Sequence, residues 1–197
     1  MPGLPPGWLT DAEAAALAEL AKDRVVLEVG AWLGRSTVVM AHTAKLVISV
    51  DHHRGSREHQ ALAEKSEYAP GLHDPQTGED STLRRFLANI EHYQTTRVRQ
   101  SSLPFRNIVP VIASFEDVAP YIGGCGMAFI DAQHDHDSVY RNAHDAWTMC
   151  LAFNAPLVFH DYGTWAGVVS AVALIQREWK ATLDVPRFTT LAVLRRG

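Results

Sequence analysis

Short apolar runs of four or five residues alternate along the chain with segments whose apolar residues have helical spacing. Runs of this length, bounded by glycine or polar residues, are typical of buried strands. Strands that alternate with helices predict an α/β fold with a doubly wound, mostly parallel sheet. The predicted strands cover residues 25–29, 46–50, 108–112, 127–130 and 156–159, with a last strand or hairpin in 188–195, and the predicted helices cover 10–22, 35–44, 81–93, 115–121, 137–153 and 165–179.

The same pattern indicates one domain, 1–197, with two additions to the alternating core. In the N-terminal region, 1–24, a helix starts at Thr10 with a capping-box pattern, because Glu13 follows three residues later. Between the second and third strands lies an insertion, 52–106, which is polar, rich in histidine and turn residues, and interrupted by one helix. Insertions this long in compact domains are usually lids or binding loops, so we expect its segment 52–80 to cover the substrate side.

The first strand leads into a glycine turn and a helix, and the second strand ends in an acid, as in a Rossmann-like β-α-β unit. Trp32 stands where a dinucleotide fingerprint needs its middle glycine, and only Gly30 and Gly34 remain, so a pyrophosphate fits badly. We expect a side chain at Gly30 to fill cofactor space. Asp51 is placed to accept hydrogen bonds from two ribose hydroxyls. The alternative is an ordinary strand-turn-helix without a ligand.

Composition and charge narrow the function classes. The 197 residues are 47% hydrophobic, enough for one core, and their net charge of −4 gives no basic field for a nucleic-acid backbone. The two cysteines, Cys125 and Cys150, suit a reducing cytoplasm without a disulfide framework. The first residues lack a signal-peptide pattern, and no apolar run approaches membrane length. We therefore expect a soluble cytoplasmic protein without nucleic-acid or membrane partners.

Polar residues gather where the later predicted strands end. Ser114 follows the third strand, Asp131 and His134 follow the fourth, and His160 and Asp161 follow the fifth. The carboxyl ends of parallel strands meet at one edge of the sheet, where ligands bind in doubly wound folds. We therefore expect these side chains to converge with the glycine turn on a single crevice.

These motifs resemble those of a known enzyme family. The pattern Glu-Val-Gly-x-x-x-Gly-x-Ser at 28–36 resembles the first motif of class I S-adenosylmethionine-dependent methyltransferases. Phe-Ile-Asp-x-x-His at 129–134 and His-Asp-Tyr at 160–162 are similar to motifs of bacterial, actinobacterial-type small-molecule O-methyltransferases, a group that includes cation-dependent members. The resemblance covers nearly the whole chain and implies S-adenosyl-L-methionine as the cofactor. The candidate cofactor-binding residues are Glu28, Gly30, Ala31, Trp32, Gly34, Ser36, Asp51, His52, Ser114, Phe115 and Asp131.

The resemblance also implies a metal site. Cation-dependent relatives hold a divalent ion through acids at the ends of the fourth and fifth strands, positions that carry Asp131 and Asp161 here. His160 departs from this pattern, because relatives often have an acid at its position. Mg²⁺ prefers oxygen ligands, whereas imidazole suits Mn, Fe, Ni or Zn. The sequence names Asp131, His160 and Asp161 as candidate ligands and leaves open whether Mg, Mn or no ion is bound.

His134 is the candidate general base, and Asp131 and His160 complete the candidate catalytic set. A hydroxyl that attacks a methyl group must lose its proton, and an imidazole accepts one near neutral pH. The alternative for His134 is a histidine that caps or packs against the following helix.

The expected function is methyl transfer from S-adenosyl-L-methionine to a small-molecule acceptor, at a hydroxyl oxygen, with assistance from a divalent metal as an option. One alternative changes the acceptor to nitrogen or to a residue of a protein. Another is a non-catalytic protein that binds the cofactor or a nucleotide. The sequence leaves the oligomeric state open, with a homodimer among the alternatives.

Overall fold

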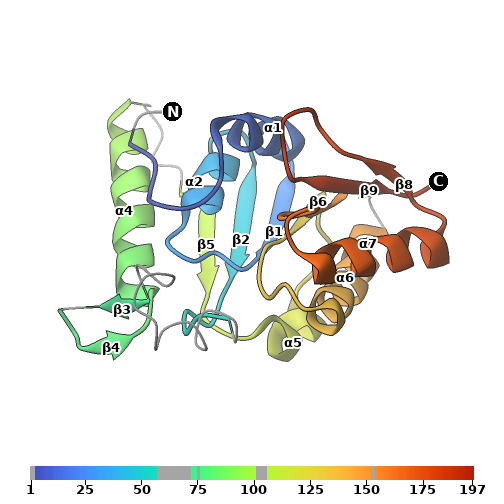
Figure 1. The fold of residues 1–197 in the computed structure, drawn as a ribbon. Coiled ribbons are helices and arrows are strands. Elements are labelled where there is room, and N and C mark those ends of the chain that lie inside the picture. Colours follow the sequence, from blue (N-terminus) through green and yellow to red (C-terminus); the bar gives the residue numbers. More distant parts are fainter. Residues whose placement is uncertain (1–2, 57–71, 75, 101–105, 152–153) are drawn as a thin grey trace.

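A seven-stranded sheet in the order β5-β2-β1-β6-β7-β9-β8 forms the centre of the molecule (Figure 1). The computed structural model describes residues 3–56, 72–74, 76–100, 106–151 and 154–197. The strands of this sheet are β1 (Val25–Val29), β2 (Leu46–Val50), β5 (Ile108–Val111), β6 (Met127–Ile130), β7 (Leu157–Phe159), β8 (Thr182–Asp184) and β9 (Ala192–Arg195).

The strand order reverses beside β1. This strand pairs in parallel with β2 on one side and with β6 on the other, and β5 and β7 extend the two halves in parallel. Only β9 runs antiparallel to its neighbours, β7 and β8, among the strand pairs of the described sheet. The predicted doubly wound, mostly parallel α/β fold is confirmed, and its switch point lies between β1 and β6, where such sheets bind ligands.

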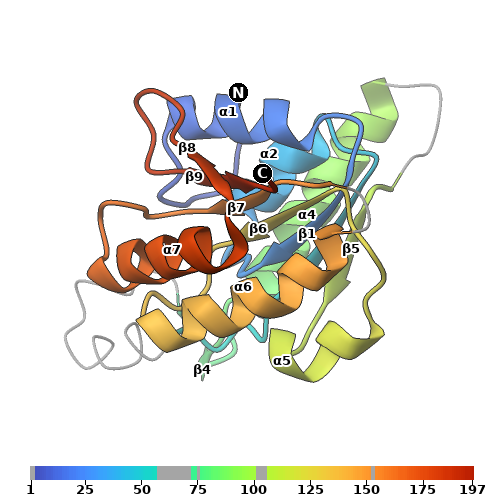
Figure 2. The ribbon, with the colours of Figure 1, turned by 90° about the vertical axis from the view of Figure 1, so that its right-hand side faces the viewer.

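Helices cover both faces of the sheet (Figure 2). One layer contains α1 (Asp11–Ala21), α2 (Arg35–Ala41) and α4 (Leu83–Gln100). The other contains α5 (Phe115–Val118) with a 3₁₀ turn, η1 (Ala119–Tyr121), followed by α6 (His136–Leu151) and α7 (Ala166–Trp179). None of the helices in the described part of the chain is long and apolar enough to cross a membrane.

Two apolar layers follow from the alternation of side chains along the strands. In β1, Val26 packs in the layer with Leu17 and Phe86, under α1 and α4. Its neighbour Leu27 packs in the opposite layer with Ile175, under α7. Because the central strands β1, β2, β6 and β7 are largely buried on both faces, most of their residues are apolar, which is why they could be recognised as short runs.

Three elements differ from the prediction. The helix expected to end at residue 93 continues to Gln100, because no glycine or proline interrupts its polar last turns. The last hairpin begins earlier than expected, since β8 starts at Thr182. Two short antiparallel strands, β3 (His73–Asp74) and β4 (Glu79–Asp80), form a second sheet within the insertion. Of the predicted cover, 52–80, residues 57–71 and 75 lie outside the described residues.

Candidate active site

A cavity of about 620 Å³ lies at the carboxyl ends of the central strands. This volume is in the range of small-molecule and cofactor sites. Most of the residues predicted for the site line it, whereas Glu28 and Gly34 are not among its described lining residues. The predicted residues that line the cavity are Gly30, Ala31, Trp32, Ser36, Asp51, His52, Ser114, Phe115, Asp131, His134, His160 and Asp161.

Asp51 holds the glycine turn in shape. Its Oδ2 accepts hydrogen bonds from the backbone N–H groups of Ala31 and Trp32, at 2.8 and 2.9 Å, and its Oδ1 accepts one from the N–H of His53 at 2.6 Å. A carboxylate has about four acceptor positions, so these three donors leave room for one hydroxyl. Asp51 therefore both orders the turn and keeps an acceptor at the cavity.

Gly30 is required by the protein backbone itself. It has a φ of +90°, and a Cβ built on it would lie 2.1 Å from the carbonyl oxygen of Asp131. A side chain at Gly30, which was expected to collide with the cofactor, would therefore already collide with the protein backbone at Asp131 and Ala132, just after β6. Gly34 also has a positive φ, +89°, at the N-cap of α2, and a Cβ there would approach Phe86 at 3.1 Å.

Glu28 lies behind the turn and is fully buried. Its carboxylate accepts hydrogen bonds from the hydroxyls of Ser36, Thr37 and Ser49, each at 2.6 Å. Burial raises the pKa of Glu28 to about 7, although the three hydroxyls act in the opposite direction. Its geometry gives it a role in fastening the start of α2 to β1 and β2, beneath the residues that line the cavity.

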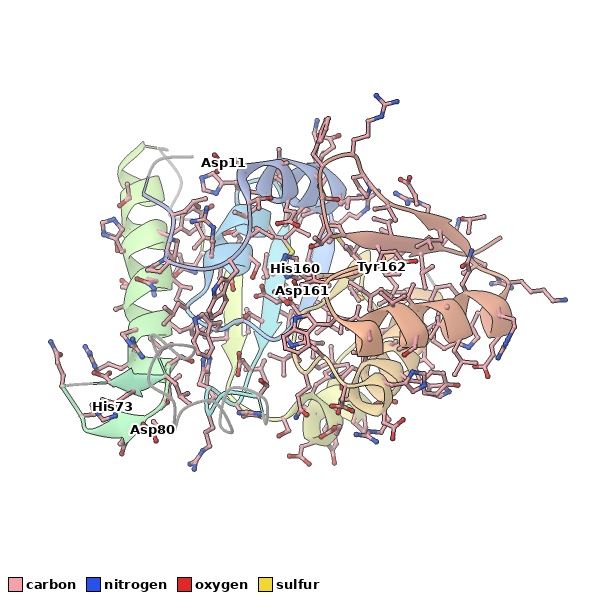
Figure 3. All side chains as sticks on the ribbon, in the orientation of Figure 1. Asp11, His73, Asp80, His160, Asp161 and Tyr162 are labelled. Carbon is pink, nitrogen blue, oxygen red and sulfur yellow. The ribbon has the colours of Figure 1, made fainter. Side chains whose placement is uncertain are left out.

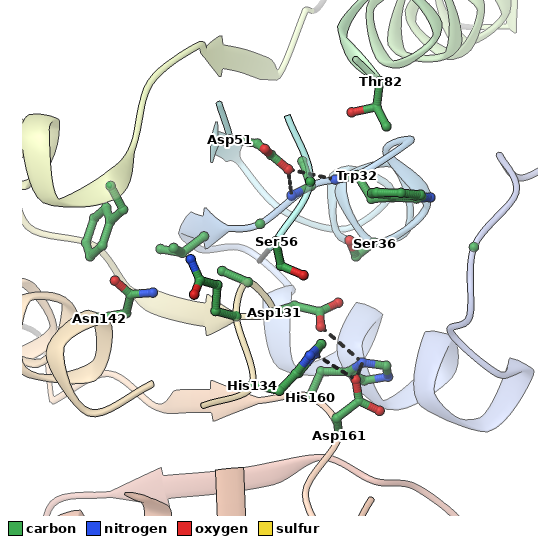
Figure 4. A pocket seen from close by; sticks show the side chains of 18 of the residues that line it. Trp32, Ser36, Asp51, Ser56, Thr82, Asp131, His134, Asn142, His160 and Asp161 are labelled. Atoms are coloured by element: carbon green, nitrogen blue, oxygen red, sulfur yellow. Dashed lines mark hydrogen bonds and ion pairs between the residues drawn. The ribbon is translucent and has the colours of Figure 1, made fainter. Parts of the chain in front are cut away.

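Four polar side chains meet at the ends of β6 and β7, and we call Asp131, His134, His160 and Asp161 the strand-end cluster (Figure 4). The Nδ1 atom of His160 lies 3.2 Å from Oδ1 of Asp131 and 3.3 Å from Oδ2 of Asp161. Nε2 of His134 lies 3.2 Å from that same Oδ2 of Asp161. Figure 3 shows His160 and Asp161 at the middle of the molecule, far from the exposed pair of His73 and Asp80.

The charges of the strand-end cluster reinforce one another. Burial alone would lower the pKa of His160, but the charges of Asp131 and Asp161 and their hydrogen bonds raise it to about 11. Burial would raise the pKa of Asp161, but hydrogen bonds from His134 and His160 outweigh burial and lower it. Without another cation in the cluster, His160 therefore carries the positive charge that the two carboxylates need.

Glu13 approaches His160 from the other side and was missed by the sequence analysis as a site residue. Its Oε2 lies 3.6 Å from Nε2 of His160, and only 3% of Glu13 is exposed. The predicted capping box is confirmed, because Glu13 accepts hydrogen bonds from Thr10. Thr190 donates two more, from its N–H and its hydroxyl. Burial would raise the pKa of Glu13, but these hydrogen bonds outweigh burial and lower the pKa to about 2.

Asp131, His160 and Asp161, which we call the ion site, have donor atoms that all lie within 4.8 Å of one another. Ligands about 2.0 to 2.2 Å from a divalent ion lie about 2.8 to 3.1 Å apart in octahedral coordination and about 3.3 to 3.6 Å apart in tetrahedral coordination. The two distances from His160 Nδ1, 3.2 and 3.3 Å, lie within the span of these two geometries. The three residues thus fit a divalent ion, and their mixed oxygen and nitrogen donors suit Mn, Fe or Zn at least as well as Mg.

His134 is held on two sides. Its ring stacks on Trp165 with centroids 4.7 Å apart and planes at 10°, and its Nε2 faces Asp161. Gly167 packs closely below, since a Cβ there would lie 2.1 Å from the carbonyl oxygen of His134. Trp165 and Gly167 belong to the start of α7, not to α6, the helix that follows His134, so these contacts do not bear on the alternative of a histidine that caps or packs against the following helix. The ring also lines the cavity.

The opposite end of the cavity is lined by α5 and α6. Ser114 occupies the predicted N-cap position of α5, without a side-chain capping bond. Asn142 of α6 was not predicted; it is 7% exposed and, like Phe115, lines the cavity. No side-chain hydrogen bond is seen for its amide among the described residues, and Figure 4 shows it on the cavity wall away from the strand-end cluster. Asn142 belongs to no sequence motif. Only the face of α6 on which it lies places it in the site, and that face could not be read from the sequence.

The N-terminal segment closes one wall, which the sequence analysis also missed. Residues 6–9 line the cavity, and Trp8 packs against Trp32 with ring centroids 5.4 Å apart. Arg35 fastens this segment by donating from Nε to the carbonyl of Leu9 at 2.9 Å and from a terminal nitrogen to that of Pro5 at 3.1 Å. The helix α2 thus anchors both the glycine turn and the segment that faces it.

Comparisons with known proteins identify the family and the fold. A family model described as a methyltransferase domain matches residues 27–162. The structure of the O-methyltransferase NovP is similar with a TM-score of 0.65 and 13% identity, over 94% of this chain and 79% of that one. The O-methyltransferase TomG from Streptomyces achromogenes, in complex with S-adenosylmethionine, gives 0.55 and 14%, over 100% and 84%. Precorrin-6y C5,15-methyltransferase from Geobacter metallireducens gives 0.61 and 8%, over 96% and 90%.

Proposed function

The chain belongs to the family of methyltransferase domains, and from this premise we propose that it transfers the methyl group of S-adenosyl-L-methionine to a hydroxyl oxygen of a small molecule, assisted by a divalent ion. The observation that carries the proposal is one cavity that joins the glycine turn to the strand-end cluster. The whole chain, 1–197, acts in this proposal as one domain, with 52–106 as its insertion.

The cofactor lies along the glycine turn in this proposal. Asp51 accepts a hydrogen bond from the ribose at its remaining acceptor position, and the backbone at Gly30 and Ala31 faces the amino-acid end. The adenine lies toward Phe115 and Asn142, where an amide has both a donor and an acceptor for the ring edge. TomG, which shares the fold, was determined with S-adenosylmethionine bound.

The acceptor lies over the strand-end cluster. Asp131, His160 and Asp161 would hold the ion, which lowers the pKa of a bound hydroxyl and orients it. Nε2 of His134 lies 3.2 Å from Oδ2 of Asp161, and in this proposal the imidazole of His134 receives the hydroxyl proton. The acceptor oxygen attacks the methyl carbon as the carbon–sulfur bond breaks, and S-adenosylhomocysteine leaves. Much of the rate comes from holding the two reactants in line.

The fold alone does not determine whether the acceptor atom is oxygen, nitrogen or carbon. NovP and TomG are named O-methyltransferases, whereas the precorrin enzyme of the same fold is named a C-methyltransferase. Oxygen is favoured here because the ion site and His134 together provide what a neutral hydroxyl needs, a Lewis acid and a base. The lone pair of a neutral amine is more nucleophilic than those of a neutral hydroxyl, so a neutral amine can attack the methyl group without either.

The test has a binding arm and a turnover arm. Calorimetric titration should show binding of both S-adenosylmethionine and S-adenosylhomocysteine. A panel of phenols, vicinal diols and matched amines, incubated with methyl-labelled cofactor, should show label on hydroxyls, with loss in EDTA and recovery with Mn²⁺ or Mg²⁺. If the label is instead transferred to amines, and this transfer continues in EDTA, the acceptor is nitrogen. If the protein does not bind the cofactor, the proposal is overturned.

A further inference from the structure

Glu13 is a buried carboxylate that faces the ion site from behind. It lies on α1, far along the sequence from β6 and β7, and its Oε2 is 3.6 Å from Nε2 of His160. That nitrogen is fully buried and has no hydrogen-bond partner within normal distance among the described residues. The carboxylate of Glu13 is a hydrogen-bond acceptor close to this nitrogen, and an acceptor is what a protonated Nε2 needs.

The two ring nitrogens of His160 have different surroundings. Nδ1 faces the carboxylates of Asp131 and Asp161, at 3.2 and 3.3 Å, whereas Nε2 faces Glu13. A neutral imidazole carries its proton on one nitrogen and a lone pair on the other, and the hydrogen bond made by one nitrogen decides which atom binds a metal. A proton on Nε2, directed at Glu13, leaves the lone pair on Nδ1, directed at the ion site.

We propose that Glu13 is a positioning residue that fixes His160 with Nδ1 toward the ion site, and thereby makes this a site for Mn²⁺-like ions in preference to Mg²⁺. The inference rests on the proposed function, because it concerns the ion that assists methyl transfer. A carboxylate behind a metal-binding histidine is a general way to orient the ring and strengthen its donor nitrogen. An imidazole donor favours transition metals, whereas Mg²⁺ prefers an all-oxygen site.

The charges near the site support this arrangement. A histidine supplies no negative charge as a ligand, so the ion site itself contributes only the carboxylates of Asp131 and Asp161. Glu13 adds a third carboxylate next to the histidine. It accepts four hydrogen bonds from the N–H groups and hydroxyls of Thr10 and Thr190, so three remain when the Thr190 hydroxyl alone is removed. Two acids thus belong to the ion site itself, and a third stands behind its histidine.

A competing explanation is that Glu13 only ties α1 to the segment before β9. Its hydrogen bonds with Thr10 and Thr190 would suffice for that task. Thr190→Val separates the two roles, because it removes the hydroxyl that donates to Glu13 at 2.7 Å but keeps the charge of Glu13. Glu19→Gln makes the same chemical change as Glu13→Gln at an exposed position of the same helix.

The experiment measures Mn²⁺ binding from the loss of the free-ion electron paramagnetic resonance signal, and Mg²⁺ by competition. The variants are Glu13→Gln, Thr190→Val, Glu19→Gln, His160→Asp and the double variant with Glu13→Gln and His160→Asp. Thermal melts show whether each variant is folded, and calorimetry measures its affinity for S-adenosylhomocysteine. All variants are measured as full chains.

Wild type should bind Mn²⁺ more tightly than Mg²⁺, and Glu13→Gln should weaken Mn²⁺ binding by about 10- to 100-fold. The controls Thr190→Val and Glu19→Gln should stay within about threefold of wild type. His160→Asp should move the preference toward Mg²⁺, and in that background Glu13→Gln should no longer weaken Mn²⁺ binding.

Equal Mn²⁺ affinity for wild type and folded Glu13→Gln would overturn the role of Glu13 and leave the proposed function standing. The same loss in Thr190→Val would also overturn it, in favour of a structural tie. A wild type that binds S-adenosylhomocysteine but no divalent ion would remove both the ion and this inference. A wild type that fails to bind S-adenosylhomocysteine would instead defeat the proposed function.

Discussion

The two halves of the cavity satisfy their polar groups in opposite ways. At the glycine turn, Asp51 accepts three backbone N–H groups and Glu28 accepts three hydroxyls, so neutral donors of the fold surround each acid. In the strand-end cluster, the acids Asp131 and Asp161 face imidazoles instead. Neutral donors that the fold holds in place keep the glycine turn in one arrangement whether or not a ligand is bound. In the strand-end cluster, by contrast, a metal ion can take the place of a proton on His160, because both are positive charges beside the same two carboxylates.

This difference predicts that substitutions in the strand-end cluster act on chemistry and those in the turn act on binding and folding. His134→Ala should reduce the rate of methyl transfer by about 10²- to 10⁴-fold, because the acceptor hydroxyl loses its base. The loss should be smaller for an acceptor that is already ionised. Steady-state kinetics measures the effect, with His144→Ala, an exposed histidine of α6, as the control. Full activity of His134→Ala would show that positioning alone suffices.

Gly30→Ala should destabilise the protein by about 2 to 5 kcal/mol, because strain at a positive φ adds to a clash with backbone. The added Cβ would lie 2.1 Å from the carbonyl of Asp131. Gly78→Ala is the matched control, since Gly78 also has a positive φ, +73°, but nothing within 4 Å. Thermal and urea unfolding measure both. Equal stability of the two variants, with cofactor binding lost only in Gly30→Ala, would assign Gly30 to cofactor space instead.

Asp51→Ala should weaken cofactor binding by about 1.5 to 3 kcal/mol, the range for hydrogen bonds to a charged group. It should also lower the melting temperature, because the N–H groups of Ala31, Trp32 and His53 lose their acceptor. Asp51→Asn keeps one acceptor oxygen and should show smaller changes in both. If calorimetry finds unchanged affinity for S-adenosylhomocysteine while the melting temperature falls, Asp51 serves the turn alone.

Glu28→Gln should flatten the pH dependence of stability. Burial raises the pKa of Glu28 from its ordinary value of 4.5 to about 7. The folded state thus holds this proton more tightly than the unfolded chain, so this contribution to stability is full below pH 4.5 and is lost as the pH rises to about 7. The melting temperature of wild type should therefore fall between pH 5 and 8 by more than that of Glu28→Gln.

The contribution of His160, whose pKa is also raised, is common to both proteins and cancels in that difference. Glu19→Gln, at an exposed position, serves as the control and should follow wild type. An identical fall in Glu28→Gln would mean that Glu28 is ionised in both the folded and the unfolded state at pH 5.

The features that could be predicted from the sequence are those that depend on residues close together in the chain. Apolar runs located the central strands, and the acids and histidines that follow them were expected at one edge because parallel strands end there. The contact between Glu13 and His160 could not be predicted, because it depends on how α1 docks against the sheet. Asn142 and Trp8 were missed for the same reason, since each reaches the cavity through packing between elements. A side chain at Gly30 was expected to fill cofactor space, and that stays a prediction; the close approach of the Asp131 carbonyl, which belongs to another strand end, could not be read from the local sequence.

The most direct test of the division into two halves is Mn²⁺ binding by wild type and by Asp161→Asn, measured with electron paramagnetic resonance alongside calorimetry with S-adenosylhomocysteine. The account predicts that Asp161→Asn weakens Mn²⁺ binding by about 10-fold or more, because an ion ligand loses its charge. It also predicts that cofactor affinity stays within about threefold, because Asp51 and the turn are unchanged. Undiminished Mn²⁺ binding by Asp161→Asn, or a parallel loss of both ligands, would contradict it.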